Sequence, residues 1–502
     1  MEETQEEKSK QEIEKITLQG DVQYVNGDYN NAILTYRQVM ILEPLNWGIY
    51  TKIGKCFKEL KEFDTAIEFF NHTIELNPEY PFAYSYIGEI YANEKGDVKK
   101  GIEYFKKHVE LEPDNFLVVN MLGHLYSKLD LYGTLDLQRK CFEKSLEIKP
   151  DFDIAIRNLA FTYSRLGRDD LSIKFFRKVL KSKEVWADDE FAFACLLIKH
   201  GFFKEGWKLF ESRFNKKFGK TLYITSDKPR WYGEKIENKT LLIQYEQGFG
   251  DTFQFSRFIP LVKKLVGKII FRVQDETLEL IKRNFPDIQV VGESTAIEDL
   301  EFDYHTPLMS LPMVLDIKMS DLITCEQRFE ADNKKVKFFK NKYFNNKDFK
   351  IGISWNGAVG GNYKRDIPVF EFLPLTKLKG VKVYSFQKGG LLNLTDEYAK
   401  SNNITIVSRD FKDFDYTASA MKNLDMFITS DNGIFNLAAT MGVPTYMLMN
   451  KESEWRWFFD ETTTPWYSDV RLFKKDFEQQ PWNCVMERAL NALNKKLLSL
   501  NK

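Results

Sequence analysis

The sequence is poor in the residues that build metal centres and covalent cross-links. Its 502 residues include only five cysteines and five histidines. The cysteines are scattered without a CxxC pair, and the histidines show neither an HExxH motif nor any other metal-ligand spacing. We therefore expect no metal site, no disulfide framework and no cofactor, in a protein of a reduced, cytoplasmic setting.

Long apolar runs and an excess of one charge are also missing. No apolar stretch approaches the ~20 residues that a membrane-spanning helix requires. The N-terminal MEETQEEKSKQEIEK is acidic and lacks the apolar core of a signal peptide. The 72 basic and 73 acidic residues give a net charge of −1. We therefore expect no transmembrane segment and no general electrostatic binding to nucleic acid.

A repeat of about 34 residues runs through the first half of the chain. Prolines recur in LEPLN, LNPEY, LEPDN and IKPDF. Small residues recur in the same phase, at Gly20, Gly54, Gly88, Gly123, Ala160 and Ala194. A small residue in a first helix lets a second helix pack close, and a proline then ends the second helix. The pattern resembles the tetratricopeptide repeat and predicts about six helical hairpins over residues 13–214.

The sixth predicted hairpin, DDEFAFACLLIKHGFFKEGWKLFESRF, is the least typical and is expected to cap the array against the next domain. Two interpretations of the array remain open. It is either a spacer and folding platform, or a concave surface that binds a protein or peptide.

The second half alternates short apolar strands with helices, which is typical of parallel α/β sheets. After a linker at 215–239, we expect one Rossmann-like domain at 240–345 and a second at 346–480, followed by an amphipathic helix at 481–502. The fold class is thus α + α/β, an α-solenoid followed by two α/β units. Ligands of such units usually bind at the carboxyl ends of the strands.

The stretch YEQGFGD is the first candidate site loop. Gly248 and Gly250 allow a tight turn and a close approach of backbone to ligand. Asp251 then starts a helix, so it is either an N-cap or a general base that faces the cleft. Aspartate carboxylates are ionised at neutral pH and can accept a proton from a hydroxyl.

Two further loops follow strand ends. GISWNGAVGGNYKRDIP places Ser354, Trp355 and Asn356 at the end of a strand and Arg365 in a glycine-rich loop, as a solvated charge or a phosphate clamp. ITSDNGIFNLAAT places Ser430, Asp431, Asn432 and Gly433 at the start of a helix. This turn is either a helix cap alone or the seat of a diphosphate, since helix N-termini bind anions.

A dense aromatic stretch lies in SEWRWFFDETTTPWYSDVRLF. Trp455, Trp457, Trp466 and Tyr467 either pack the two α/β units together or line a pocket for a sugar or base. Packing is the commoner role for such residues.

Seven stretches, taken in order, resemble the glycosyltransferase family 9 group, which is heptosyltransferase-like. They are EQGFGDTFQFSRFIPL, HTPLMSLP, GISWNGA, RDIPVFEFLPL, YSFQKG, DYTASAMKNLDMFITSDNGIFNLAATMGVPTYML and EWRWFFD with TPWYSDVRLF. These stretches cover about 240–475. The resemblance implies a GT-B fold, a nucleotide-sugar donor bound mainly by the C-terminal domain, inversion at the sugar, and no required metal.

Carried over by position, the resemblance makes Asp251 the general base and Arg365 the residue that meets the donor phosphate. Gln387 lies near the donor, and the turn from Ser430 to Gly433 lies near the diphosphate. The chain departs from the family pattern at two positions, which are Asn432 in place of threonine and Asn436 in place of histidine.

The sequence thus predicts a glycosyltransferase whose repeats recruit a protein or glycan acceptor. Two alternatives remain. The chain is a repeat scaffold with a degenerate, inactive transferase domain, or its GT-B half catalyses another reaction of nucleotide-sugars, such as epimerisation.

Overall fold

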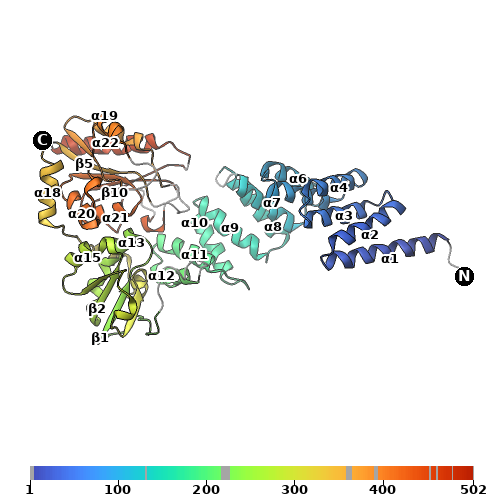
Figure 1. Ribbon diagram of the computed structural model, residues 1–502, viewed down its shortest axis with the longest axis horizontal. Coiled ribbons are helices and arrows are strands. Elements are labelled where there is room, and N and C mark those ends of the chain that lie inside the picture. The colour runs from blue at the N-terminus through green and yellow to red at the C-terminus, as the bar shows by residue number, and fades with distance from the viewer. Residues whose placement is uncertain are drawn as a thin grey trace. The chain divides into compact units, whose positions relative to one another are not determined.

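The computed structural model describes residues 5–129, 133–215, 226–357, 365–388, 394–451, 454–458, 462–477 and 479–500. The chain divides into two compact units, Met1–Glu184 and Val185–Lys502. Figure 1 labels their main helices and strands. Among the described residues, no helix combines the length and the apolar character that a bilayer span requires.

The first unit is built from helices that pack as successive antiparallel pairs (Figure 1). Their bounds are α1 Gln5–Val25, α2 Tyr29–Leu42, α3 Trp47–Glu59, α4 Phe63–Leu76, α5 Pro81–Glu89, α6 Val98–Leu111, α7 Phe116–Leu129, α8 Leu135–Ile148, α9 Asp153–Arg165 and α10 Asp169–Val179. A π-helical turn, Ile90–Glu94, extends α5.

The glycines of the repeat allow close packing within each helix pair. A Cβ atom on Gly54 of α3 would lie 2.8 Å from the Phe70 ring of α4, and one on Gly88 would lie 2.7 Å from the Phe105 ring. The aromatic ring of the second helix therefore fills the space that the missing side chain leaves. This is the physical reason for the glycine periodicity in the sequence.

The prolines of the repeat end the second helices, as the sequence predicts. Pro44, Pro78, Pro113 and Pro150 each lie two residues beyond the last residue of α2, α4, α6 and α8. A proline at the next helical position would remove a hydrogen bond and clash with the preceding turn.

The second unit begins with α11 (Ala187–Lys199), α12 (Phe203–Phe210) and a 3₁₀ turn, Glu211–Phe214. This is the sixth predicted hairpin. Its Ala194, Ile198 and Trp207 are fully or almost fully buried in a hydrophobic cluster shared with the two α/β sheets. The hairpin is therefore part of the core of the C-terminal unit.

A four-stranded parallel sheet follows, with strand order β3-β2-β1-β4. Its strands are β1 Ile236–Gln244, β2 Val266–Val273, β3 Gln289–Gly292 and β4 Tyr304–Pro307. Its helices are α13 Phe249–Phe255, α14 Ile259–Val262, α15 Leu278–Asn284, α16 Leu311–Val314, α17 Met319–Thr324 and α18 Asn333–Tyr343. Strand β1 starts inside the predicted linker, where Trp231 is already buried and its N–H donates to His305 O over 2.9 Å.

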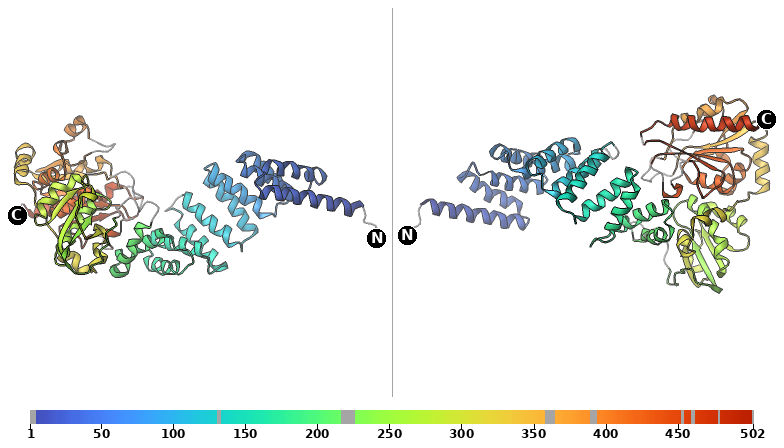
Figure 2. Two further views of the ribbon diagram at one scale, coloured as in Figure 1. Left: turned by 60° about the horizontal axis from the view of Figure 1, so that its bottom comes forward. Right: turned by 180° about the vertical axis from the view of Figure 1, so that it is seen from behind.

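A six-stranded parallel sheet completes the unit, with strand order β10-β9-β8-β5-β6-β7. Its strands are β5 Phe349–Ser354, β6 Val381–Ser385, β7 Ile404–Ile406, β8 Met426–Ser430, β9 Thr445–Met449 and β10 Val470–Lys474. Its helices are α19 Asp396–Ser401, α20 Phe414–Met421, α21 Gly433–Thr440 and α22 Trp482–Leu500. Figure 2 shows α22, in red, along one face of this sheet, where its apolar side joins a second core cluster.

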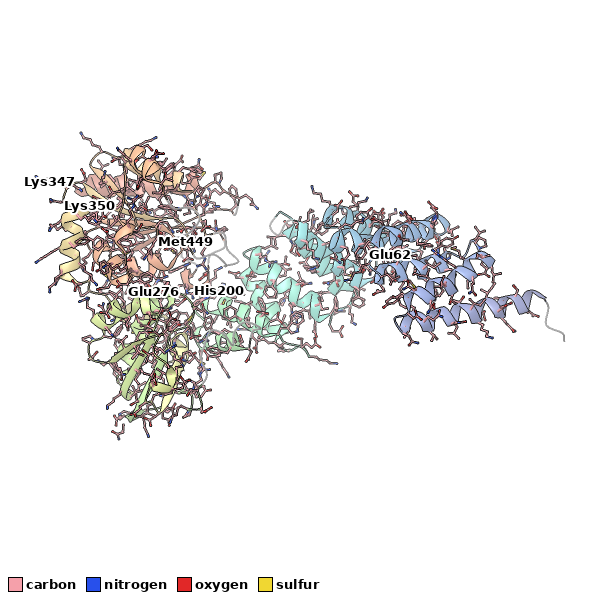
Figure 3. The ribbon with its side chains drawn as sticks, in the orientation of Figure 1. Glu62, His200, Glu276, Lys347, Lys350 and Met449 are labelled. Atoms are coloured by element: carbon pink, nitrogen blue, oxygen red, sulfur yellow. The ribbon has the colours of Figure 1, made fainter. Side chains whose placement is uncertain are left out.

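Chain order reverses in the six-stranded sheet between β5 and β8, which are adjacent strands. Open α/β sheets bind ligands at the carboxyl ends of strands beside such a point. Ser354 ends β5 and Ser430 ends β8, so both predicted loops leave the sheet there. Figure 3 marks Met449, which ends the next strand, β9.

Candidate functional site

Asn432 joins the two loops at this point of the sheet. It is the N-cap of α21, and its Oδ1 accepts from the Phe435 N–H over 2.9 Å. Its Nδ2 lies 3.3 Å from Ser354 Oγ and 3.4 Å from Asn356 O. Its own strand adds Thr429 Oγ1 at 3.1 Å and Ser430 Oγ at 3.3 Å. The capping role therefore belongs to Asn432, and the same side chain ties β8 to β5.

Gln387 lies two residues beyond the end of the neighbouring strand β6 and holds the loop after β5. Its Oε1 accepts from Ser354 Oγ over 2.9 Å and from the N–H groups of Trp355 and Asn356 over 3.1 Å. Three donors on one oxygen fix the direction in which this loop leaves the sheet. The Trp355 side chain is fully buried in the cluster beneath α22, so it belongs to the core.

Asp431 and the aromatic stretch lie together. Asp431 Oδ2 accepts from Trp457 Nε1 over 2.9 Å, and Trp457 is fully buried. Trp455 packs on Trp207 of α12 with a ring-centroid distance of 5.4 Å. Trp466 is also fully buried. The tryptophans therefore pack the α/β sheets against each other and against the hairpin α11–α12.

The glycine loop after β1 approaches the turn that begins α21. A Cβ atom on Gly250 would lie 2.7 Å from Asn436 Nδ2 and 3.3 Å from Gly433 Cα. Asn436 Oδ1 accepts from the Tyr467 hydroxyl over 3.1 Å, and burial raises the pKa of Tyr467, which keeps this hydroxyl protonated. The first residues of α13 and α21 are thus in contact, and Gly250 provides the space.

Asp251 is the third residue of α13, and Gly248 is its N-cap. Asp251 Oδ2 accepts from the Gly248 N–H over 3.1 Å. The suggestion that Asp251 is itself the N-cap is therefore wrong, because it caps the helix from inside the first turn. Gly248 has φ −85°, and the left-handed residue of the loop is Gln247, with φ 55°.

Four charged side chains form a continuous chain across the site. Asp251 Oδ1 pairs with Arg456 Nη2, and Arg456 Nη1 pairs with one oxygen of Glu454. The other oxygen of Glu454 pairs with Arg365 Nη2. The predicted base and the predicted phosphate clamp are therefore linked through two residues that the sequence analysis missed. The sequence signal for these two residues is the pair of charges in SEWRW, Glu454 and Arg456, which lie among the aromatic residues of that stretch.

A second ion-pair network lies behind the glycine loop. Glu246 is fully buried, and its carboxylate accepts two hydrogen bonds from the Arg213 guanidinium. Oε2 accepts from Nε over 2.9 Å, and Oε1 accepts from Nη2 over 3.1 Å. Its Oε1 also accepts from the Met309 N–H over 2.9 Å. Arg213 belongs to the turn after α12 and pairs with Glu211 over 2.6 Å. The sixth hairpin therefore holds the residue just before the glycine loop.

The arrangement brings two guanidinium groups and two carboxylates together beside the first turn of α21. The helix N-terminus adds partial positive charge there. Within the described ranges, no group of three or more His, Cys, Asp or Glu side chains is placed to hold a metal ion.

Comparisons with known proteins bear on the helical array. The tetratricopeptide-repeat family matches residues 48–80 and 158–185. The N-terminal unit contains tetratricopeptide repeats.

Similar proteins cover parts of the chain. Protein FlbA of Caulobacter vibrioides (strain ATCC 19089 / CIP 103742 / CB 15) is 25% identical over 338 residues, which are 62% of this chain and 56% of FlbA. The chain thus spans about half the length of this relative. The crystal structure of MamA is 25% identical over 34% of this chain and 91% of its own, with a TM-score of 0.30. PilW, a type IV pilus biogenesis factor of known crystal structure, is 18% identical in sequence. The match covers 42% of this chain and 98% of PilW, with a TM-score of 0.35.

Proposed function

We propose that the C-terminal unit is a glycosyltransferase of the GT-B class that moves a sugar from a nucleotide-diphosphate-sugar to an acceptor hydroxyl. One observation carries the proposal. The Asp251 carboxylate of the first sheet and the Arg365 guanidinium of the second belong to one ion-pair chain, beside the contact between α13 and α21.

In the proposed reaction, Asp251 accepts the proton of the acceptor hydroxyl as its oxygen attacks the anomeric carbon. The new carbon–oxygen bond forms while the bond from that carbon to the diphosphate breaks, on the opposite face. The nucleoside diphosphate leaves with the electron pair of the broken bond. Arg365, Arg456 and the amides at the start of α21 would stabilise its charge.

Binding of nucleotide-sugars to the full chain tests the proposal. Calorimetric titration with UDP-, GDP-, ADP- and CMP-sugars should reveal one preferred donor, and mass spectrometry of native partners should then find the same sugar on an acceptor. A folded protein that binds none of these donors would contradict the proposal. A donor that is isomerised without transfer would instead favour the epimerase alternative.

We further propose that the repeats select the acceptor. The supporting observation is the array of tetratricopeptide repeats in the same chain as the candidate site. The alternative is a scaffold whose α/β unit is inactive, and the departures from the family pattern at Asn432 and Asn436 are the observation that favours it. A bound donor without any turnover would support that alternative.

A further inference from the structure

Glu454 bridges two arginines from different parts of the chain. One carboxylate oxygen pairs with Arg365 and the other with Arg456. The Glu454 side chain is 17% exposed and that of Arg456 is 10% exposed, so water screens this pair less than it screens a surface salt bridge. A partly buried bridge of this kind holds both guanidinium groups in fixed positions.

A carboxylate held by two arginines marks a place that a phosphate can occupy. Guanidinium groups bind phosphate oxygens in the same planar fork with which they bind carboxylates. A diphosphate offers more oxygens and more charge than one carboxylate. Arg365 has a spare donor as well, because its Nε is buried and makes no hydrogen bond to any described residue.

Each oxygen of the Asp251 carboxylate already has one donor in this arrangement. Oδ1 pairs with Arg456, and Oδ2 accepts from the Gly248 N–H. A general base must present an oxygen to the proton that it removes. The Arg456 guanidinium competes with an acceptor hydroxyl for this carboxylate, so Asp251 is better placed to act as proposed once Arg456 has turned to another anion.

We propose that Arg365 and Arg456 together clamp the diphosphate, that Glu454 holds the clamp when no donor is bound, and that transfer of Arg456 to the diphosphate frees Asp251. This inference rests on the proposed function and adds an order to it. The donor binds first, and its binding makes the base available for the acceptor. The base is thereby kept from activating water before a donor is present.

Binding of inorganic pyrophosphate to the full chain, measured by calorimetry at low ionic strength, tests the clamp. Glu454→Gln removes the competing charge and should tighten binding by about tenfold, whereas Arg456→Gln should weaken it by about 10- to 100-fold. Arg139→Gln is a matched control, because Arg139 pairs with Glu143 over 2.6 Å in the repeat unit. It should bind pyrophosphate like the native chain.

A double-mutant cycle tests the release of Asp251. Asp251→Asn should tighten pyrophosphate binding several-fold, because Arg456 no longer has to leave a carboxylate. The same change made in the Arg456→Gln background should have no effect, since only the interaction with Arg456 couples the two sites. A purely structural ion pair would change the unfolding midpoint without this pattern in pyrophosphate affinity.

The outcomes separate this inference from the proposed function. Unchanged pyrophosphate affinity in folded Glu454→Gln and Arg456→Gln overturns the clamp, even if a nucleotide-sugar binds and is turned over. Absence of pyrophosphate binding to the native chain at millimolar concentration also overturns it. The predicted affinity pattern supports the clamp even where every nucleotide-sugar fails, and in that case only the proposed function falls.

Discussion

At the scale of single residues, the site depends on side chains that serve the fold and the proposed chemistry together. Asn432 caps α21 and joins two strands, and Asp251 caps α13 and pairs with Arg456. A substitution at such a position changes two properties at once. A matched position elsewhere, with the structural role alone, separates them.

Asp251→Asn is expected to lower turnover at least about a hundredfold while donor binding persists, because an amide cannot accept the proton. Asp321→Asn is its control, since Asp321 caps α17 in the same way, accepting from the Lys318 N–H over 2.8 Å. Steady-state kinetics with the identified donor measure the effect. Equal turnover of the Asp251 variant and the native protein would remove Asp251 from the mechanism.

Gly250→Ala is expected to destabilise the C-terminal unit by about 1–3 kcal/mol, because the added Cβ overlaps Asn436 Nδ2 and approaches Gly433. Gly248→Ala should cost much less, since its Cβ would have only Asp251 Oδ2 near it, at 3.7 Å. Urea unfolding of both variants compares the two costs. Similar losses at both positions would show that the contact between α13 and α21 is not tight.

His108→Gln should reveal a pH-dependent contribution of a buried histidine. Burial holds the pKa of His108 below its usual value, although Glu112 lies 3.0 Å away. Below about pH 6.5 the unfolded chain therefore binds a proton that the folded chain takes up only at lower pH, so stability falls as pH falls.

Unfolding of the native chain and of His108→Gln between pH 5 and 8 measures this effect. The stability advantage of the native chain should shrink as pH is lowered. His72→Gln is the control, because the His72 side chain is 57% exposed. An advantage that is constant with pH would contradict the assignment.

At the scale of elements, the buried pair of Arg213 and Glu246 connects the sixth hairpin to the glycine loop. Arg213→Met should cost about 3–5 kcal/mol, since it leaves a buried carboxylate without its partner. Adding Glu246→Leu should recover much of that loss, because two apolar side chains replace the pair.

Arg139→Met is the control for a pair that is only partly buried, and it should change stability by about 1 kcal/mol or less. Thermal unfolding followed by circular dichroism ranks the three variants. A double variant that is no more stable than Arg213→Met would show that the pair has a role beyond its charge balance.

Local patterns predicted most of the elements, and long-range contacts explain what they missed. The glycine and proline spacing predicted the helix pairs, and the apolar runs predicted the strands and their polar ends. Asp251 and Arg456 are 205 positions apart, so no local pattern could pair them. Asn432, the N-cap of α21, also donates from Nδ2 to Ser354, which belongs to another strand, so no local pattern could show this contact.

At the scale of the whole molecule, the division of the chain falls between residues 184 and 185, at the end of the fifth helix pair. The sequence periodicity predicts that the sixth hairpin belongs to the repeat array. Its buried residues instead pack with the α/β sheets, because Trp207 and Phe210 contact Trp455. A repeat-like sequence therefore forms part of a different core.

Removal of residues 1–184 is expected to leave the second unit folded and able to bind its donor, while transfer to a protein acceptor is lost. Removal of residues 1–200 should destabilise that unit, because it deletes the buried Ala194 and Ile198 of α11. Near-ultraviolet circular dichroism and donor titration compare the two truncations. Transfer that survives the first truncation would show that the repeats are a spacer.

The sixth hairpin also determines at which residue the repeat array can be exchanged to build a chimera. Its arginine anchors the glycine loop and its aromatic residues fill the core, so α11 and α12 must stay with the sheets in any chimera. The five pairs before it belong to the other compact unit, which ends at Glu184. Under the proposed function, an array of another length joined at residue 185 is expected to present the same site to a different acceptor.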